Sequence, residues 1–374
     1  MTTFFVTGAS GAMAPFLIHQ FLHEEAGHRF LCLARRADAA QRLRHRIAAI
    51  CPPCAPRIEA PLVTFVEGDI TRPLPAMGRV DAVWHFAADL RMDPGAAQAV
   101  TAANLAGTRN VLDLCTASGA TLYYISTAYV CGKRTGVVRE DELLCGQGFR
   151  NAYEFSKAQA EAMVQAWMGD HPGIVFRPSI VLGDTRTGIA LAFQGLYNMV
   201  WAIWFLKERL AERTGRAGGA LADLVLRIPI IIPCFSADAG INVVGAEYVT
   251  ALLVDLHRRP DSLGRTFHLA NPRPPTLETL LDMTTRVMGV RGMRLMQNSG
   301  IHLHDLHESI RRLGGWLWDR VGVYCPYLIG DHPFFDMSNV ALVRGAIPQH
   351  PPLDEATLHR LYTFAVARRF RDIE

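Results

Sequence analysis

The chain has 374 residues, of which 50% are hydrophobic and 20% charged. This length allows two domains, or one large α/β domain with an appendage, and the apolar fraction excludes intrinsic disorder. Lysine and arginine (38) nearly balance aspartate and glutamate (35), so the formal charge is only +3. That balance excludes a protein that coats nucleic acid through charge, and we expect no nucleic-acid partner.

The amino terminus runs directly into a strand-like segment, with no basic region followed by an apolar one. We therefore expect no signal peptide, a cytoplasmic location and reduced cysteines. Cys51 and Cys54 form a single Cys-x-x-Cys pair, and His302, His304 and His307 lie close together in sequence. Because a structural zinc ion needs four ligands and neither group supplies them, we predict no metal site.

The first half of the chain alternates predicted strands with predicted helices. The strands are Thr3–Thr7, Arg29–Ala34, Leu62–Val66, Val80–Phe86, Thr121–Ser126 and Ile174–Arg177. The helices are Gly11–Glu25, Asp38–Ile50, Pro94–Ser118 and Ala152–Gly169, and Pro52–Pro61 is a predicted loop. This alternation predicts an α/β fold of the Rossmann type, a doubly wound parallel sheet with helices on both faces.

The second half is less regular. An apolar stretch, Ile189–Leu206, contains Gln194 and Asn198, which favours a buried or lid helix over a membrane span or contact with a membrane surface. The other predicted elements are helices at Val243–His257, Thr276–Met288, 300–320 and 353–371 and a strand at Phe267–Ala270. We predict a Rossmann domain over residues 1–185 and a smaller, mostly helical substrate lobe over 186–374, with part of 240–272 returning to the first domain.

A glycine-containing turn separates the first strand from the first helix. Gly8 permits a tight turn with positive φ, and Gly11 lets the backbone approach a pyrophosphate at the helix N-terminus. Ala14 replaces the usual third glycine, which only needs to be small. The residues predicted to contact a dinucleotide here are Thr7, Gly8, Ser10, Gly11, Ala12 and Met13.

The end of the second predicted strand indicates which dinucleotide binds. NAD sites usually place an acidic residue there, whereas Arg35 and Arg36 suit the 2′-phosphate of NADP(H), so we expect NADP(H) rather than NAD(H). After the third strand, Asp69 and Ile70 are expected near the adenine.

Two further segments suggest catalytic side chains. Tyr153 and Lys157 are four apart on a predicted helix and therefore share a face. A neighbouring ammonium is expected to lower the pKa of the phenol and make Tyr153 a proton donor, and Lys157 is also expected to bind the nicotinamide ribose. Ser126 and Thr127 end a strand about 25 residues earlier, where a hydroxyl can donate to a carbonyl oxygen that becomes negative.

The order of these segments resembles the extended short-chain dehydrogenase/reductase family over most of residues 3–270. The residues that carry the resemblance are Thr7-Gly8-xx-Gly11, Asp69, Ala87-Ala88, Asn104-xx-Gly107-Thr108, Thr127, Tyr153, Lys157 and Arg177-Pro178-Ser179. It implies a catalytic set of Thr127, Tyr153 and Lys157, with Ser126 as the alternative hydroxyl. It also adds Ala87, Ala88, Asp89, Asn104, Tyr153, Lys157, Pro178 and Ser179 to the expected cofactor contacts, Asn104 in a mostly structural role.

A narrower resemblance concerns the thioester-reductase and fatty acyl-CoA reductase branch. It is carried by Ser126–Val130, Gly183-Asp184-xxx-Gly188 and Leu33-Ala34-Arg35. It implies NADPH-dependent hydride transfer to an acyl thioester, held on a separate carrier protein or on coenzyme A, to give an aldehyde or an alcohol. The alternatives are a sugar-nucleotide epimerase or dehydratase with tightly bound NAD, a ketone or β-hydroxy-acyl reductase, and a nucleotide-sensing module.

Overall fold

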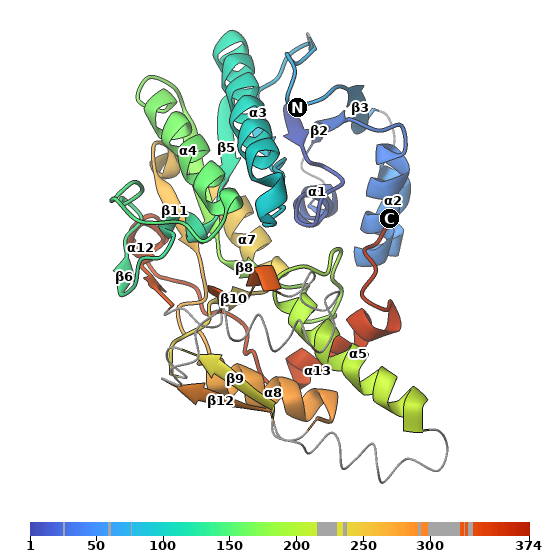
Figure 1. Cartoon of the computed structure of the whole chain (residues 1–374). Coiled ribbons are helices and arrows are strands. Elements are labelled where there is room, and N and C mark those ends of the chain that lie inside the picture. Colours follow the sequence, from blue (N-terminus) through green and yellow to red (C-terminus); the bar gives the residue numbers. More distant parts are fainter. Residues whose placement is uncertain are drawn as a thin grey trace.

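A seven-stranded sheet, in which every pairing is parallel, forms the centre of the molecule (Figure 1). The computed structural model describes residues 1–24, 27–58, 61–75, 77–214, 230–234, 238–290, 293–297, 322–324, 326–327 and 332–374. In spatial order the strands are β11 (Thr266–Leu269), β7 (Gly173–Pro178), β5 (Thr121–Ile125), β4 (Ala82–His85), β1 (Thr2–Thr7), β2 (His28–Ala34) and β3 (Val63–Glu67). The predicted Rossmann-type fold is confirmed.

Helices cover both faces of this sheet, and each face has its own apolar core. The helices are α1 (Ala14–His23), α2 (Ala39–Ile50), α3 (Ala97–Ser118), α4 (Ala152–Trp167) and α7 (Ala246–His257). Side chains of α1, α2 and α7 share one core, while α3 and α4 lie side by side over the other. Because both faces are covered, central strands such as β4 and β7 are buried at every residue, and they lack the apolar–polar alternation of a half-exposed sheet.

A second group of helices packs around a separate core outside the main sheet (Figure 1). Its helices are α5 (Leu196–Thr214), α8 (Leu277–Met288) and α13 (Glu355–Ala367), and α12 (Ser338–Arg344) packs against β11. Three short parallel pairs accompany them: β8 (Ile180–Val181) with β10 (Val243–Val244), β9 (Ile230–Cys234) with β12 (Met293–Gln297), and β6 (Val137–Val138) with β13 (Phe334–Phe335). The 3-10 turns are η1 (Pro52–Arg57), η2 (Pro94–Ala96), η3 (Ala128–Cys131), η4 (Pro260–Ser262) and η5 (Gly322–Tyr324).

Several predicted boundaries are wrong, and so is one predicted loop. The helix expected from Val243 begins only at Ala246, because Val243 and Val244 pair with β8. The helix expected from Ile189 begins at Leu196, after a segment in which Gly188 has φ of +80° and Gly195 of +60°. The expected loop at 52–61 contains η1.

Two further predictions concern the apolar helix and the carboxyl-terminal region. No helix in the described ranges is long and apolar enough to cross a bilayer. The predicted helix at 300–320, with its histidines, lies outside the described residues. The last residues return to α2, whose Arg46 side chain donates to the Ile373 carbonyl at 2.8 Å.

Candidate active site

A cavity of about 970 Å³ runs along the carboxyl ends of β1, β2, β3 and β4. In open parallel sheets this edge is the usual ligand site. Of the residues predicted to contact the cofactor, those that line the cavity are Gly8, Ser10, Gly11, Arg35, Arg36, Asp69, Ile70, Ala87, Ala88, Asp89 and Asn104. Segments far apart in the chain therefore meet at the predicted place.

The glycine turn lies at one wall of the cavity. Gly8 has φ of +69°, and a Cβ atom added there would lie 2.8 Å from the backbone nitrogen of Ala87. A Cβ on Gly11 would lie 2.9 Å from the Gly8 carbonyl oxygen. The turn thus has room only for glycine at both positions, and it leads into the N-terminus of α1, which attracts anions. These features fit a dinucleotide pyrophosphate.

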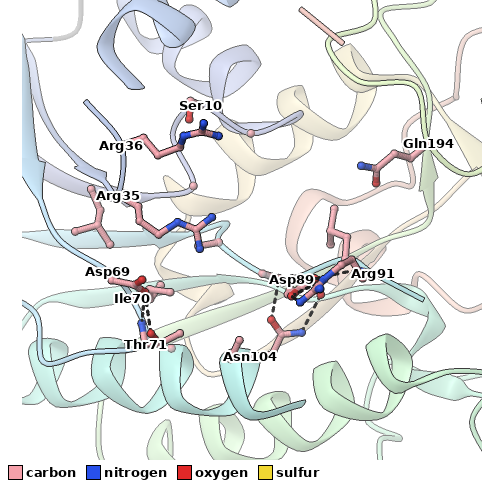
Figure 2. A pocket seen from close by; sticks show the side chains of 18 of the residues that line it. Ser10, Arg35, Arg36, Asp69, Ile70, Thr71, Asp89, Arg91, Asn104 and Gln194 are labelled. Atoms are coloured by element: carbon pink, nitrogen blue, oxygen red, sulfur yellow. Dashed lines mark hydrogen bonds and ion pairs between the residues drawn. The ribbon is translucent and has the colours of Figure 1, made fainter. Parts of the chain in front are cut away.

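Arginines mark the end of the cavity near β2 and β3, and Figure 2 shows Arg35 reaching into it, with Arg36 near Ser10. Arg36 pairs with Asp38 at 3.7 Å, but Arg35 makes no ion pair with any described residue. Asp69 accepts hydrogen bonds from the backbone and hydroxyl of Thr71, both at 2.9 Å. The Thr71 backbone bond, aided by Arg35 nearby, lowers the pKa of Asp69, so this carboxylate is charged at neutral pH.

The opposite end of the cavity is tied to α4. The Arg91 guanidinium donates to both oxygens of the Asp89 carboxylate, at 3.0 and 2.6 Å, and holds the pKa of Asp89 below the usual range. The Asn104 amide bonds the Asp89 backbone at both N–H and carbonyl, and donates to the Ser156 hydroxyl at 2.9 Å. Ser156 lies between Tyr153 and Lys157, so Asn104 links the cavity wall to the predicted catalytic turn.

Thr127 and Tyr153 come together as predicted, but the pKa of the phenol does not shift as predicted. The two side chains are close enough that the Thr127 hydroxyl acts to lower the pKa of Tyr153. Removal of the phenol from water outweighs it and raises the pKa to about 12. The expectation of a lowered pKa is therefore wrong for the protein alone, and Tyr153 is protonated at neutral pH.

The Lys157 ammonium points to strand β5. It donates to the Tyr124 hydroxyl at 2.8 Å and to the Ile125 carbonyl at 2.7 Å, and it lies 4.1 Å from the centre of the Tyr124 ring. Burial lowers its pKa to about 7, against the opposing charge of Glu161. These bonds hold the Lys157 nitrogen at β5.

The alternative hydroxyl, Ser126, belongs to a buried ionic cluster. It donates to one oxygen of Glu161 at 2.5 Å, and Arg177 donates twice to the other oxygen, at 2.9 and 2.6 Å. The clustered side chains of Glu161 and Arg177 are fully buried. Of the two hydroxyls, only Thr127 thus faces Tyr153.

The remaining predicted residues do not line the cavity. Thr7 turns inward, where its hydroxyl meets the ring nitrogen of His85 at 2.8 Å and accepts from the Ala87 amide at 3.2 Å. Ala12 is exposed and Met13 packs into the core. Pro178 and Ser179 are buried at the end of β7, where the Pro178 carbonyl accepts from Thr127 at 3.5 Å. Tyr153 and Lys157 also lie outside the lining.

Several residues that line the cavity were not predicted from the sequence. Arg91 follows Asp89 closely, but an isolated arginine in a loop carries no pattern. Phe193, Gln194, Asn198 and Tyr324 close the cavity from the second half of the chain, and Figure 2 shows Gln194 opposite the glycine turn and Arg35. For two of them the sequence did contain a signal, because Gln194 and Asn198 are the polar residues that interrupt the apolar stretch Ile189–Leu206.

Comparison with known families agrees with this site. A family model described as Male sterility protein, an NAD-binding family, matches residues 6–214, more than half of the chain. The chain belongs to this family. The predicted recognition is thereby confirmed: the chain is an NAD(P)-dependent oxidoreductase of the extended short-chain dehydrogenase/reductase type, in its thioester-reductase branch.

Relatives of this Male sterility family member include two nonribosomal peptide synthetases. The chain is 24% identical over 409 residues to the non-canonical nonribosomal peptide synthetase FrzA of a Cladobotryum species, covering 97% of the chain and 36% of the relative. It is 23% identical to the nonribosomal peptide synthetase asaC of Aspergillus flavus, covering 78% of the chain and 28% of the relative. The chain thus spans about a third of the length of these curated relatives.

Solved structures share the fold. The terminal R domain of the myxalamid PKS-NRPS pathway matches with a TM-score of 0.78 and 23% identity, covering 100% of the chain and 92% of that domain. A thiolation-reductase di-domain of an archaeal nonribosomal peptide synthetase gives 0.74 and 16%, covering 98% of the chain and 75% of that structure. The nonribosomal peptide synthetase reductase domain of Mycobacterium tuberculosis gives 0.70 and 18%, covering 99% and 92%.

Proposed function

We propose that this chain is an NADPH-dependent reductase that transfers hydride to the carbonyl carbon of an acyl thioester and yields an aldehyde or an alcohol. The observation that carries the proposal is the juxtaposition of the Thr127 and Tyr153 hydroxyls, on elements that Asn104 ties to a cavity whose glycine turn leaves no room for a Cβ atom. A hydroxyl pair beside a dinucleotide groove suits carbonyl reduction.

Arg35 supports the choice of NADP(H). Its guanidinium reaches into the cavity at the end of β2, where the ribose of the adenosine half would lie, and it makes no direct ion pair with any described residue. A 2′-phosphate would provide a direct ion-pair partner for it. Arg36, already paired with exposed Asp38, would contribute less.

The chain's own groups can then perform the polar part of the reaction. NADPH, when bound, supplies the hydride. Thr127 and Tyr153 would hydrogen-bond the carbonyl oxygen, and Tyr153 would give its proton to that oxygen as negative charge develops. A phenol with a pKa of about 12 is suited to this donation, because it holds its proton at neutral pH until the oxyanion forms. The hemithioacetal then loses its thiol and leaves an aldehyde.

The relatives support a carrier-bound substrate. Two are nonribosomal peptide synthetases, and one solved structure joins a thiolation domain to a reductase domain. We infer that the acyl group arrives on the phosphopantetheine arm of a carrier protein, or on coenzyme A. A sugar-nucleotide epimerase, the main rival, would instead purify with NAD held tightly.

The test is oxidation of NADPH by the purified protein with acyl-CoA, acyl-pantetheine and carrier-bound acyl thioesters, beside ketones and sugar nucleotides. Tyr153→Phe should lower kcat by about 10²–10⁴-fold while NADPH binding persists. Tyr123→Phe, which changes a β5 tyrosine on the strand face opposite Tyr124, is the matched control. Turnover by Tyr153→Phe equal to that of the parent, or reduction of ketones but not thioesters, would refute the proposal.

Cofactor choice is tested separately by binding. Arg35→Glu should weaken NADPH about 10- to 100-fold, the cost of a charge-assisted phosphate contact, and leave NADH almost unchanged. Arg29→Glu, at the far end of the same strand, is the control and should change neither affinity. An unchanged preference for NADPH in Arg35→Glu would exclude the role of this arginine.

A further inference from the structure

Two pairs of metal-binding residue types lie outside the cavity, in the first part of the chain. His19 and His23 form a His-x₃-His pair on α1, and Cys51 and Cys54 form a Cys-x₂-Cys pair at the start of η1. These spacings are the ones found within the ligand pairs of Cys₂His₂ zinc sites. The sequence analysis dismissed the cysteines because no second pair lies near them in sequence.

The fold brings the two pairs together. One ligand atom each of His19, Cys51 and Cys54 lie within 4.8 Å of one another, and the two sulfur atoms are 2.7 Å apart. Cys54 is buried, while the other two are half-buried. This is possible because α1 packs against both α2 and η1. The cluster is therefore shielded by protein but reachable by an ion.

The second histidine lies one turn further along α1. Its exposed ring stacks on that of His19, with the ring centres 6.0 Å apart and the planes inclined by 23°. Two imidazoles thus lie on the same side of α1, and that of His19 lies beside the two thiols.

We propose that His19, His23, Cys51 and Cys54 form a structural Zn²⁺ site with tetrahedral geometry. Binding would replace the two thiol protons with one Zn²⁺, release those protons to water and leave two Zn–S and two Zn–N bonds. Tetrahedral geometry with Zn–S bonds of about 2.3 Å requires sulfur atoms about 3.8 Å apart, so the cysteines would separate slightly and His23 would rotate inward.

Such a site would not line the dinucleotide cavity, but it would stabilise the helices that follow two of its walls. It would join the second half of α1 to the end of α2, and Arg46 of α2 donates to the Gly11 carbonyl at 2.7 Å. The glycine turn precedes α1, and Arg35 precedes α2. Zinc would therefore stabilise the arrangement of the two segments that would hold the pyrophosphate and the 2′-phosphate.

A redox disulfide between Cys51 and Cys54 is the competing use of the same cysteines. It would leave the two histidines without a function. The observations thus favour a metal ion.

The experiment titrates Co²⁺ into the reduced, metal-free, full-length protein and records absorption. We expect one equivalent to give intense d–d bands and a thiolate charge-transfer band, which Zn²⁺ then displaces. Cys51→Ser/Cys54→Ser should lose both, and His19→Gln or His23→Gln should weaken binding about 10-fold or more. Cys145→Ser, which removes an exposed cysteine, and His359→Gln, on the exposed side of α13, are the matched controls and should behave like the parent.

A second readout uses the unmutated protein, so it does not depend on whether the variants fold. Zn²⁺ should raise its Tm, and a chelator should reverse that rise. Absence of a charge-transfer band in protein whose thiols all react with a thiol reagent would overturn the proposal. So would a Cys51–Cys54 disulfide in the purified protein combined with no Co²⁺ binding after reduction. Unchanged affinity in His23→Gln would remove His23 from the site.

Discussion

The buried ion pair between Glu161 and Arg177 gives the sharpest stability prediction. Glu161→Gln keeps the shape of the side chain but removes its charge, which leaves the Arg177 guanidinium buried without a counter-ion. The two groups are 2.6 Å apart and both side chains are 0% exposed. Removing one partner of a fully buried pair costs about 3–5 kcal/mol in the free energy of unfolding. The same change weakens the acceptor of the Ser126 hydroxyl.

The chain contains a control with the same distance and the opposite exposure. Arg286 and Glu355 are also 2.6 Å apart, but their side chains are 57% and 52% exposed. Glu355→Gln should cost less than about 1 kcal/mol, because water already screens this pair. If distance decided the energy, the two substitutions would have equal effects.

The assay is urea unfolding of parent, Glu161→Gln and Glu355→Gln, followed by circular dichroism at one salt concentration. Arg177→Met combined with Glu161→Leu should recover part of the loss, because neither charge then remains buried. The recovery is incomplete, since the Ser126 hydroxyl loses its partner. A cost below about 1 kcal/mol for Glu161→Gln, or equal costs for the two single variants, would refute the reasoning.

Three other predictions concern single side chains. Burial raises the pKa of Glu140 from 4.5 to about 7. Its contribution to the free energy of unfolding is therefore complete below pH 4.5 and disappears as the pH rises through 7. Glu140→Gln should remove about 3 kcal/mol of the pH dependence of that free energy, measured by urea unfolding. Gly8→Ala should abolish NADPH binding in calorimetry, because its Cβ meets the Ala87 backbone at 2.8 Å, whereas Gly264→Ala, with similar φ but open space, should only lower stability by about 1–2 kcal/mol. Asn104→Ala breaks three hydrogen bonds and should lower Tm and kcat together in melting and turnover assays; a change in only one of them would contradict its linking role.

The parts of the fold that the sequence predicted share a physical cause. Strands such as β4 and β7 are short and fully buried, and they alternate with helices of ten residues or more. That contrast is visible in the order of apolar residues alone. β8 and β10 were missed because each has two residues, and their pairing depends on a contact across more than sixty positions of sequence.

The candidate site, like the fold, contains some residues that the sequence predicts and others that only the structure shows. Gly8 and Gly11 are readable because only glycine fits the turn, so the residue type reports the geometry. Tyr124 holds the Lys157 ammonium, yet it is one apolar-looking residue in a buried strand, and nothing in its neighbours distinguishes it. His19 and Cys51 lie on different elements, and only the packing of α1 on η1 shows that they meet. Functions that depend on backbone conformation leave a local pattern, whereas functions that depend on tertiary contact do not.

The Asn104 contacts explain why the cavity and the hydroxyl pair must act as one unit, although the pair lies outside the cavity lining. Hydride transfer requires reacting atoms about 3–3.5 Å apart, so α4 has to keep a fixed position relative to the cofactor groove. Asn104 connects the cofactor groove to α4 through two bonds to Asp89 and one to Ser156, and its side chain is 5% exposed. Since Ser156 shares a helical turn with Tyr153 and Lys157, movement of the Asp89 wall on ligand binding would be transmitted directly to the phenol.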